Sequence, residues 1–120
     1  MTRWLLADDD NSNRVTLAVL LEDEGKEVDV ASSFAEARDS LTSGTTYDLV
    51  LLDQHLGDGL GTDLVPIVRK HHPGARIVLI SGSLAAEELG ITSVDAVVPK
   101  GTEFPLMLAR LEDVLKTKVS

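Results

Sequence analysis

The chain has 120 residues, enough for one domain with an ordinary core and too few for a second folded unit, so residues 1–120 are predicted to form a single domain. Hydrophobic residues make up 43% and charged residues 26%, which is typical of globular proteins, and there is neither a membrane-length apolar run nor a signal segment. The formal charge of -9 disfavours direct binding to nucleic acid, and the absence of cysteine excludes thiol chemistry and fits the reducing cytoplasm, where we expect the protein to lie.

Two strands with a helix between them are predicted at the start of the chain. The apolar run 4–7 indicates a strand that stops at three consecutive aspartates. Asn11 or Ser12 can cap the helix that follows. Residues 27–31 alternate polar and apolar side chains, as a half-buried strand at the edge of a sheet does. The helix is expected to direct four apolar side chains inward: Val15, Leu17, Ala18 and Leu21.

A second helix and a buried strand follow. Ser33 and Glu36 have the spacing of a capping box, which predicts a helix that begins between them. The unbroken apolar run 49–52 then predicts a strand buried on both faces. This strand ends at Asp53 and leads into a glycine-rich loop, so it delivers a carboxylate to the edge where open α/β sheets bind ligands.

The rest of the chain repeats the strand–helix alternation. A third helix is predicted to begin near Thr62 or Asp63, because Pro66 is tolerated only in a first turn. Residues 75–80 form a continuous apolar strand that ends at Ser81.

Three elements are predicted after that strand. Residues 84–89 suffice for a short helix, and residues 94–98 predict a fifth strand that runs into Lys100. Thr102 can cap the last helix. The inward stripe of this helix is expected to be Phe104, Leu108, Leu111 and Leu115.

Five strands that alternate with five helices indicate an α/β fold with a parallel sheet covered on both faces. The edge-like second strand favours the flavodoxin-like, doubly wound order 2-1-3-4-5 over a dinucleotide-binding fold. A flavin-binding function is disfavoured, because the first strand has no phosphate-cradling loop after it and aromatic residues make up only 3% of the chain.

The carboxyl ends of the strands are predicted to bring reactive side chains together. Asp8, Asp9 and Asp53 would crowd three carboxylates, which need raised pKa values or a cation between them. Oxygen ligands without His or Cys indicate Mg²⁺ rather than zinc. Ser81 and Lys100 add a hydroxyl and an ammonium group, which complete a site suited to a phosphoryl group.

This set of residues resembles the receiver domain of two-component response regulators, and the resemblance covers essentially the whole chain. Asp8 and Asp9 match the acidic pair of that family, and Asp53 matches its phosphoacceptor. Ser81 matches the switch hydroxyl and Lys100 the invariant lysine, and the glycine of the loop after the phosphoacceptor is also present. The order of these residues along the chain makes the signal specific.

The resemblance implies that Asp53 accepts a phosphoryl group from a phosphohistidine of a partner and later loses it, without turnover of a separate substrate. It implies that Mg²⁺ is held by Asp8, Asp9, Asp53 and the backbone carbonyl of His55. Lys100 would pair with the phosphate. Ser81, the switch hydroxyl, would move to bind it.

The resemblance also implies the partners. These are a sensor histidine kinase or histidine phosphotransfer protein and a downstream target or effector domain, without a membrane or direct nucleic-acid contact. The face formed by the fourth helix, fifth strand and fifth helix would be available for a dimer. The identity of the kinase, the output and the oligomeric state stay open.

Three positions depart from the family pattern. Val97 stands where an aromatic residue often reports the switch, and Gly57 replaces a proline, which is expected to loosen the loop after Asp53. Gly101 replaces a proline that usually follows a cis bond, so we expect a trans bond or a strained loop there. His55 and Ser83 flank the phosphoryl position and are expected to tune the lifetime of the phosphate.

Several charged or polar residues have a structural interpretation. Asp10 is interpreted as a first-turn charge that favours the helix dipole, and Trp4 as a strand residue at the margin of the sheet. His71 and His72 are interpreted as part of a basic last helical turn rather than a metal or anion site.

Two other functions remain as alternatives. One is a Mg²⁺-dependent phosphohydrolase with an aspartyl nucleophile, although such enzymes carry that nucleophile on the first strand in an Asp-x-Asp pattern. The other is a receiver-like docking module that works without phosphorylation, which Val97 and Gly101 keep open.

Overall fold

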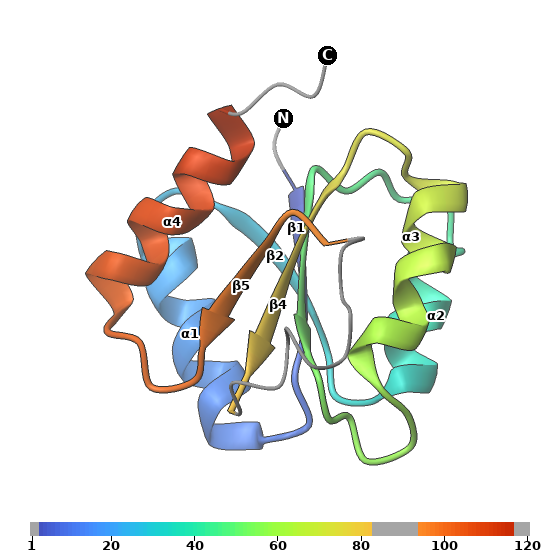
Figure 1. The fold of residues 1–120 in the computed structure, drawn as a ribbon, viewed down its shortest axis with the longest axis horizontal. Coiled ribbons are helices and arrows are strands. Elements are labelled where there is room, and N and C mark those ends of the chain that lie inside the picture. The colour runs from blue at the N-terminus through green and yellow to red at the C-terminus, as the bar shows by residue number, and fades with distance from the viewer. Residues whose placement is uncertain (1–2, 83–93, 117–120) are drawn as a thin grey trace.

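A computed structural model describes residues 3–82 and 94–116 of the chain. Five parallel strands form one sheet in the order β2-β1-β3-β4-β5, so the predicted flavodoxin-like order is confirmed (Figure 1). The strands are β1 (Arg3–Ala7), β2 (Glu27–Ala31), β3 (Leu49–Asp53), β4 (Arg76–Ser81) and β5 (Ala96–Pro99). The α-helices are α1 (Asn11–Asp23), α2 (Phe34–Leu41), α3 (Val65–His71) and α4 (Phe104–Lys116), and a short 3-10 helix, η1 (Gly61–Leu64), precedes α3.

The helices cover both faces of the sheet. Figure 1 shows α1 and α4 on one face and α2 and α3 on the other. Alternate residues of β3 take part in the two cores: Val50 and Leu52 pack with the α2 and α3 side, whereas Leu49 and Leu51 pack with the α1 and α4 side. All four are fully buried, as the continuous apolar run predicts for a central strand.

The strands confirm most of the predicted pattern and correct two details. Trp4 is fully buried rather than marginal, because β1 lies between β2 and β3 and the ring faces the α1 and α4 side. The fifth strand begins at Ala96, two residues later than predicted. Just before it, the Asp95 side chain accepts the backbone N–H of Ile77 at 2.7 Å, a bond that a regular ladder would give to a backbone carbonyl. The predicted helix over 84–89 lies outside the described residues.

Two predicted helix caps are wrong. Asp10, not Asn11 or Ser12, caps α1, because its carboxylate accepts the Asn13 N–H at 3.0 Å. The hydroxyl of Thr102 donates to the Pro99 carbonyl at 2.6 Å and closes the turn after β5 instead of capping α4.

Other features of the helices follow the sequence more closely. Ser33 caps α2 as predicted, and Pro66 lies in the first turn of α3. On α1, Ala18 and Leu21 face the core, but Val15 is 51% exposed rather than inward. None of the helices in the described part of the chain has the length and apolarity that crossing a bilayer requires.

The interpretation of His71 and His72 as part of a basic last helical turn is confirmed for His71, whereas His72 is the C-cap that follows α3. Its side chain is buried, with Nδ1 3.4 Å from the Tyr47 backbone N–H and Nε2 2.8 Å from the Leu41 carbonyl. The imidazole therefore accepts from one segment and donates to the other, which joins the end of α2 to the segment before β3.

We expect His72→Ala to lower the free energy of unfolding by about 2 kcal/mol, because it removes a buried ring and leaves two backbone groups unpaired. Urea unfolding followed by circular dichroism measures this loss. His71→Ala is the matched control, since His71 is exposed and should change stability by less than about 0.5 kcal/mol. Equal effects of the two changes would contradict the structural role of His72.

Candidate functional site

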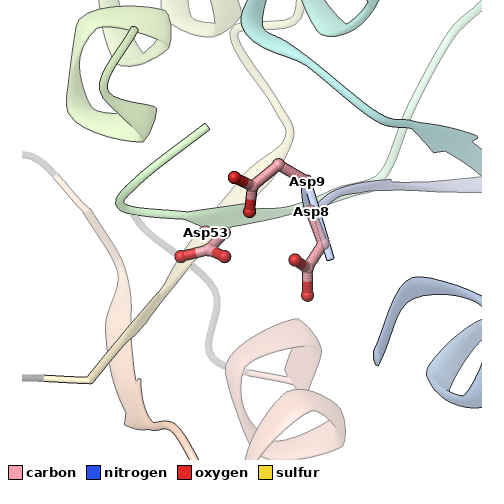
Figure 2. Close-up of side chains that lie close together, drawn as sticks. All are labelled: Asp8, Asp9 and Asp53. Carbon is pink, nitrogen blue, oxygen red and sulfur yellow. The ribbon is translucent and has the colours of Figure 1, made fainter. Parts of the chain in front are cut away.

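The predicted acidic residues meet at the carboxyl edge of the sheet. Asp8 and Asp9 follow β1, and Asp53 ends β3, which is paired with β1. One carboxylate oxygen from each of the three residues lies within 4.8 Å of the others. Figure 2 shows Asp9 directing its carboxylate toward Asp53, with Asp8 beneath the same strand ends.

Burial and charge repulsion both act on Asp8. Its side chain is buried, and desolvation together with the neighbouring Asp53 raises the pKa of Asp8 to about 6, even though its Oδ1 accepts the Asp10 N–H at 2.9 Å. A carboxylate with this pKa is held at a free-energy cost when it is ionised. A cation bound among the three carboxylates would remove that cost.

Asp53 is 1% exposed and forms an ion pair with Lys100, whose Nζ lies 2.9 Å from Oδ2. This contact raises the pKa of Lys100 above its ordinary value, so the ammonium stays charged. Oδ1 accepts the backbone N–H of His55 at 3.2 Å. Oδ2 accepts no backbone N–H from the described residues and has the Lys100 ammonium as its charged partner.

The donor set fits Mg²⁺. The groups that converge are carboxylate oxygens, including those of the buried Asp53, with no thiolate or imidazole among the three residues. The backbone carbonyl of His55 belongs to the loop that leaves this cluster, next to Asp53.

The switch hydroxyl predicted from the sequence also lies at this edge. Ser81 is the last residue of β4 and is buried, and its carbonyl accepts the Lys100 N–H at 2.9 Å. This bond holds the start of the Lys100 turn beside Ser81. Ser83 lies outside the described residues.

The loop after Asp53 packs so closely that one position admits only glycine. A Cβ atom built on Gly61 would lie 2.3 Å from the Asp53 carbonyl oxygen and 3.3 Å from Cβ of Leu52. The Gly61 N–H donates to the Gln54 carbonyl at 2.9 Å, which fixes this close approach. The absence of a side chain at Gly61 therefore allows the loop to pack against the backbone of Asp53.

Three residues that brace the site are not apparent from sequence patterns. Arg14 donates to the Asp8 carbonyl at 3.0 Å, and Gln54 is buried with its side-chain oxygen 3.3 Å from the Thr62 N–H. Asp58 accepts two N–H groups at the start of α2. An arginine in the first turn of a helix, such as Arg14, and polar residues in a tight loop have many other common roles. Their positions in the sequence alone therefore could not identify these contacts.

The departures from the family pattern have distinct outcomes. The Lys100–Gly101 bond is trans, as expected, since the described residues contain no cis peptide, and Gly101 has φ 87°, a region that favours glycine. Val97 is partly buried against the α2 and α3 side of the core. Gly57 has φ 78°, but the loop that it was expected to loosen is held by the contacts of Asp58.

Comparison with known proteins agrees with this geometry. The alginate biosynthesis transcriptional regulatory protein AlgB from Pseudomonas syringae is 37% identical over 95 residues, which cover 79% of this chain and 20% of that protein. A response regulator receiver protein from an Anaeromyxobacter species is 32% identical over 111 residues, covering 90% of this chain and 46% of that protein. The chain thus spans between about a fifth and a half of the length of these relatives.

A solved structure gives a similar match. The response regulator TrrA from Thermotoga maritima, described in complex with Mg²⁺ and BeF, superimposes with a TM-score of 0.85 at 30% identity and covers 95% of this chain and 99% of that one. Residues 4–112 of the chain match the family described as the response regulator receiver domain. With the sheet order and the strand-end residues in place, this match shows that the chain belongs to the response regulator receiver domain family.

Proposed function

We propose that this receiver domain accepts a phosphoryl group on Asp53 from a phosphohistidine of a partner protein and uses it to switch a protein-interaction surface. The observation that carries the proposal is the buried Asp53 carboxylate, paired with Lys100 at 2.9 Å and flanked by the oxygens of Asp8 and Asp9. Loss of the phosphoryl group to water would reset the domain.

The contacts of Asp53 support one of its oxygens as the nucleophile. Oδ1 is engaged by the His55 N–H, whereas Oδ2 accepts no such bond and faces Lys100. In the transfer, a bond forms between Asp53 oxygen and phosphorus while the bond between phosphorus and the donor imidazole nitrogen breaks, and the electron pair of that bond returns to the imidazole. The Lys100 ammonium then pairs with a phosphoryl oxygen, and Ser81 supplies a hydroxyl donor.

Asp8, Asp9, Asp53 and the His55 carbonyl would hold Mg²⁺, and the complex named for the Thermotoga relative supports this choice of ion. Bound Mg²⁺ supplies positive charge that offsets the negative charge of the phosphoryl group and the carboxylates. Asp8 and Asp9 position that charge, and Lys100 places a second positive group on Asp53.

The partners follow from the same chemistry. A sensor histidine kinase or a histidine phosphotransfer protein would supply the phosphohistidine, and a downstream protein or an effector domain would read the switched surface. The relatives that extend well beyond the matched region support an effector domain in the same polypeptide as one arrangement.

Intact-mass measurement after incubation with Mg²⁺ and a small-molecule phosphodonor tests the proposal. We expect wild type to gain the mass of one phosphoryl group, and we expect Asp53→Ala to gain none because the nucleophile is absent. Asp39→Ala, which removes an exposed carboxylate of α2, is the matched control and should be modified as wild type is. Removing Mg²⁺ with a chelator should suppress the adduct.

The outcomes separate the alternatives. Absence of an adduct on wild type would contradict the phosphoacceptor function and favour a docking module that works without phosphorylation. Steady consumption of the donor at enzyme-like rates would favour a phosphohydrolase.

A further inference from the structure

The loop after Asp53 is attached to the first turn of α2 through Asp58. Asp58 Oδ1 accepts the Phe34 N–H at 2.7 Å, and its Oδ2 accepts the Ala35 N–H at 3.1 Å. Phe34 and Ala35 are the first two residues of α2, whose N–H groups have no partner within the helix. Asp58 therefore caps α2 from 24 residues away in the sequence.

A second contact holds the same loop against α2. A Cβ atom built on Gly59 would lie 2.7 Å from the Phe34 ring, so the ring packs directly on the loop backbone. On its other side the loop is anchored by Leu56, which is 1% exposed. The loop itself is closed by a bond from the Leu56 N–H to the Gly59 carbonyl at 3.0 Å.

The loop carries groups of the proposed phosphoryl site. The His55 N–H donates to Asp53, and a Cβ atom on Gly57 would lie 3.7 Å from Oδ2 of Asp9. Asp58 directly follows Gly57 in the chain. Movement of Asp58 would thus move the backbone that donates to Asp53 and the Gly57 backbone that lies beside the Asp9 carboxylate.

We propose that Asp58 is a positioning residue that couples the start of α2 to the Mg²⁺ and phosphoryl site through the loop formed by residues 54–60. The coupling is reciprocal, as linkage requires: an ion that orders the loop also stabilises the bonds from Phe34 and Ala35, and loss of those bonds weakens ion binding. The inference rests on the proposed function, because it concerns the same Mg²⁺ site.

The chain offers a matched control on the same helix end. Glu36 is also an exposed carboxylate near the start of α2, and it accepts the Ser32 N–H and the Ser32 hydroxyl, each at 2.7 Å. Its bonds hold Ser32, the residue before the Ser33 cap, and do not involve the loop that carries His55. Glu36→Ala should therefore disturb the helix start without disturbing the site.

Calorimetric titration with Mg²⁺ alone, without a phosphodonor, provides the first measurement. We expect Asp58→Ala to raise the Mg²⁺ dissociation constant by about fivefold or more, the lower end of typical coupling between sites. Glu36→Ala should leave it unchanged. Wild-type affinity in Asp58→Ala, or equal weakening in Glu36→Ala, would overturn the inference.

Amide hydrogen exchange provides a readout that does not depend on catalysis or on the ion. In Mg²⁺-free protein, Asp58→Ala should speed exchange of the His55 amide, and Glu36→Ala should not. In wild type, Mg²⁺ should slow exchange at Phe34 and Ala35.

Loss of the metal site and loss of the Asp58 coupling give different results. If wild type bound no Mg²⁺, the metal site of the proposed function would fail, and the coupling to the ion would fail with it. If wild type bound Mg²⁺ but the His55 amide and the Mg²⁺ affinity were both unchanged in Asp58→Ala, only the positioning role would be overturned.

Discussion

Gly61→Ala is expected to lower the free energy of unfolding by about 3 kcal/mol or more, the upper range for forcing an extra methyl group into a packed region. The new Cβ would meet the Asp53 carbonyl oxygen at 2.3 Å, and that oxygen is a backbone atom that cannot rotate away. Gly61 is itself pinned by its bond to Gln54, so relief requires the end of β3 to move. We therefore also expect slower phosphorylation of Asp53.

Urea unfolding and the phosphorylation assay measure the two effects. Gly74→Ala is the control, because no atom lies within 4 Å of its new Cβ and Gly74 is not among the glycines with positive φ. That change should be neutral or should stabilise the protein by up to about 1 kcal/mol. Wild-type stability in Gly61→Ala would show that the loop can shift without strain and would contradict this account.

Asp8→Asn is expected to stabilise the Mg²⁺-free protein and to weaken Mg²⁺ binding. The native pKa of Asp8 is raised to about 6 from 3.8, so between these values the native state binds more protons than the unfolded state and stability falls as pH rises. The amide removes this charge while its oxygen can still accept the Asp10 N–H. Above pH 6, we expect a gain of up to about 3 kcal/mol, because the pKa is raised by about two units and each unit corresponds to about 1.4 kcal/mol.

The stability gain of Asp8→Asn should depend on pH. The advantage of Asp8→Asn should be small at pH 4, increase through the window and be complete above about pH 6. Removing one of the three carboxylates should raise the Mg²⁺ dissociation constant by at least about tenfold, since mutating residues that only hydrogen-bond to metal ligands already weakens binding by about this factor. Chemical unfolding at several pH values and Mg²⁺ titration measure both.

Asp9→Asn separates the two effects. Asp9 is exposed, so neutralising it should change the stability of the Mg²⁺-free protein little while still weakening Mg²⁺ binding. If Asp8→Asn destabilised the Mg²⁺-free protein at pH 8, burial of its charge would not be the dominant effect.

The sheet order could be predicted because the pattern of apolar residues in a strand indicates whether the strand is central or at an edge. Residues 49–52 of β3 are apolar and fully buried, whereas β2 alternates polar and apolar residues and is only partly buried as an edge strand, although Val30, on its apolar set, is 48% exposed. From that order the meeting of Asp8, Asp9 and Asp53 followed directly, because parallel strands end at the same edge.

The errors came from local competition and from distant partners. Three adjacent residues, 10–12, are all good helix caps, so composition could not show that Asp10 is the one used. The burial of His72 could not be predicted from the basic turn beside it, because it depends on Leu41 and Tyr47, far away in the sequence. Asp58 was missed for the same reason, since its partners lie 23 and 24 residues away.

The strand order also has a consequence for how the domain folds. Asp8 comes from near the beginning of the chain and Lys100 from near its end, and the two residues share one site because Lys100 reaches Asp53 across β4, while β1 pairs with β3 on the other side. Contacts of such high sequence separation carry a large loop-closure entropy and form slowly. A partly folded chain that lacks β5 would have the acidic cluster without the Lys100 ammonium group. Recovery of phosphorylation during refolding should therefore report the addition of β5 to the sheet rather than the earlier formation of β1.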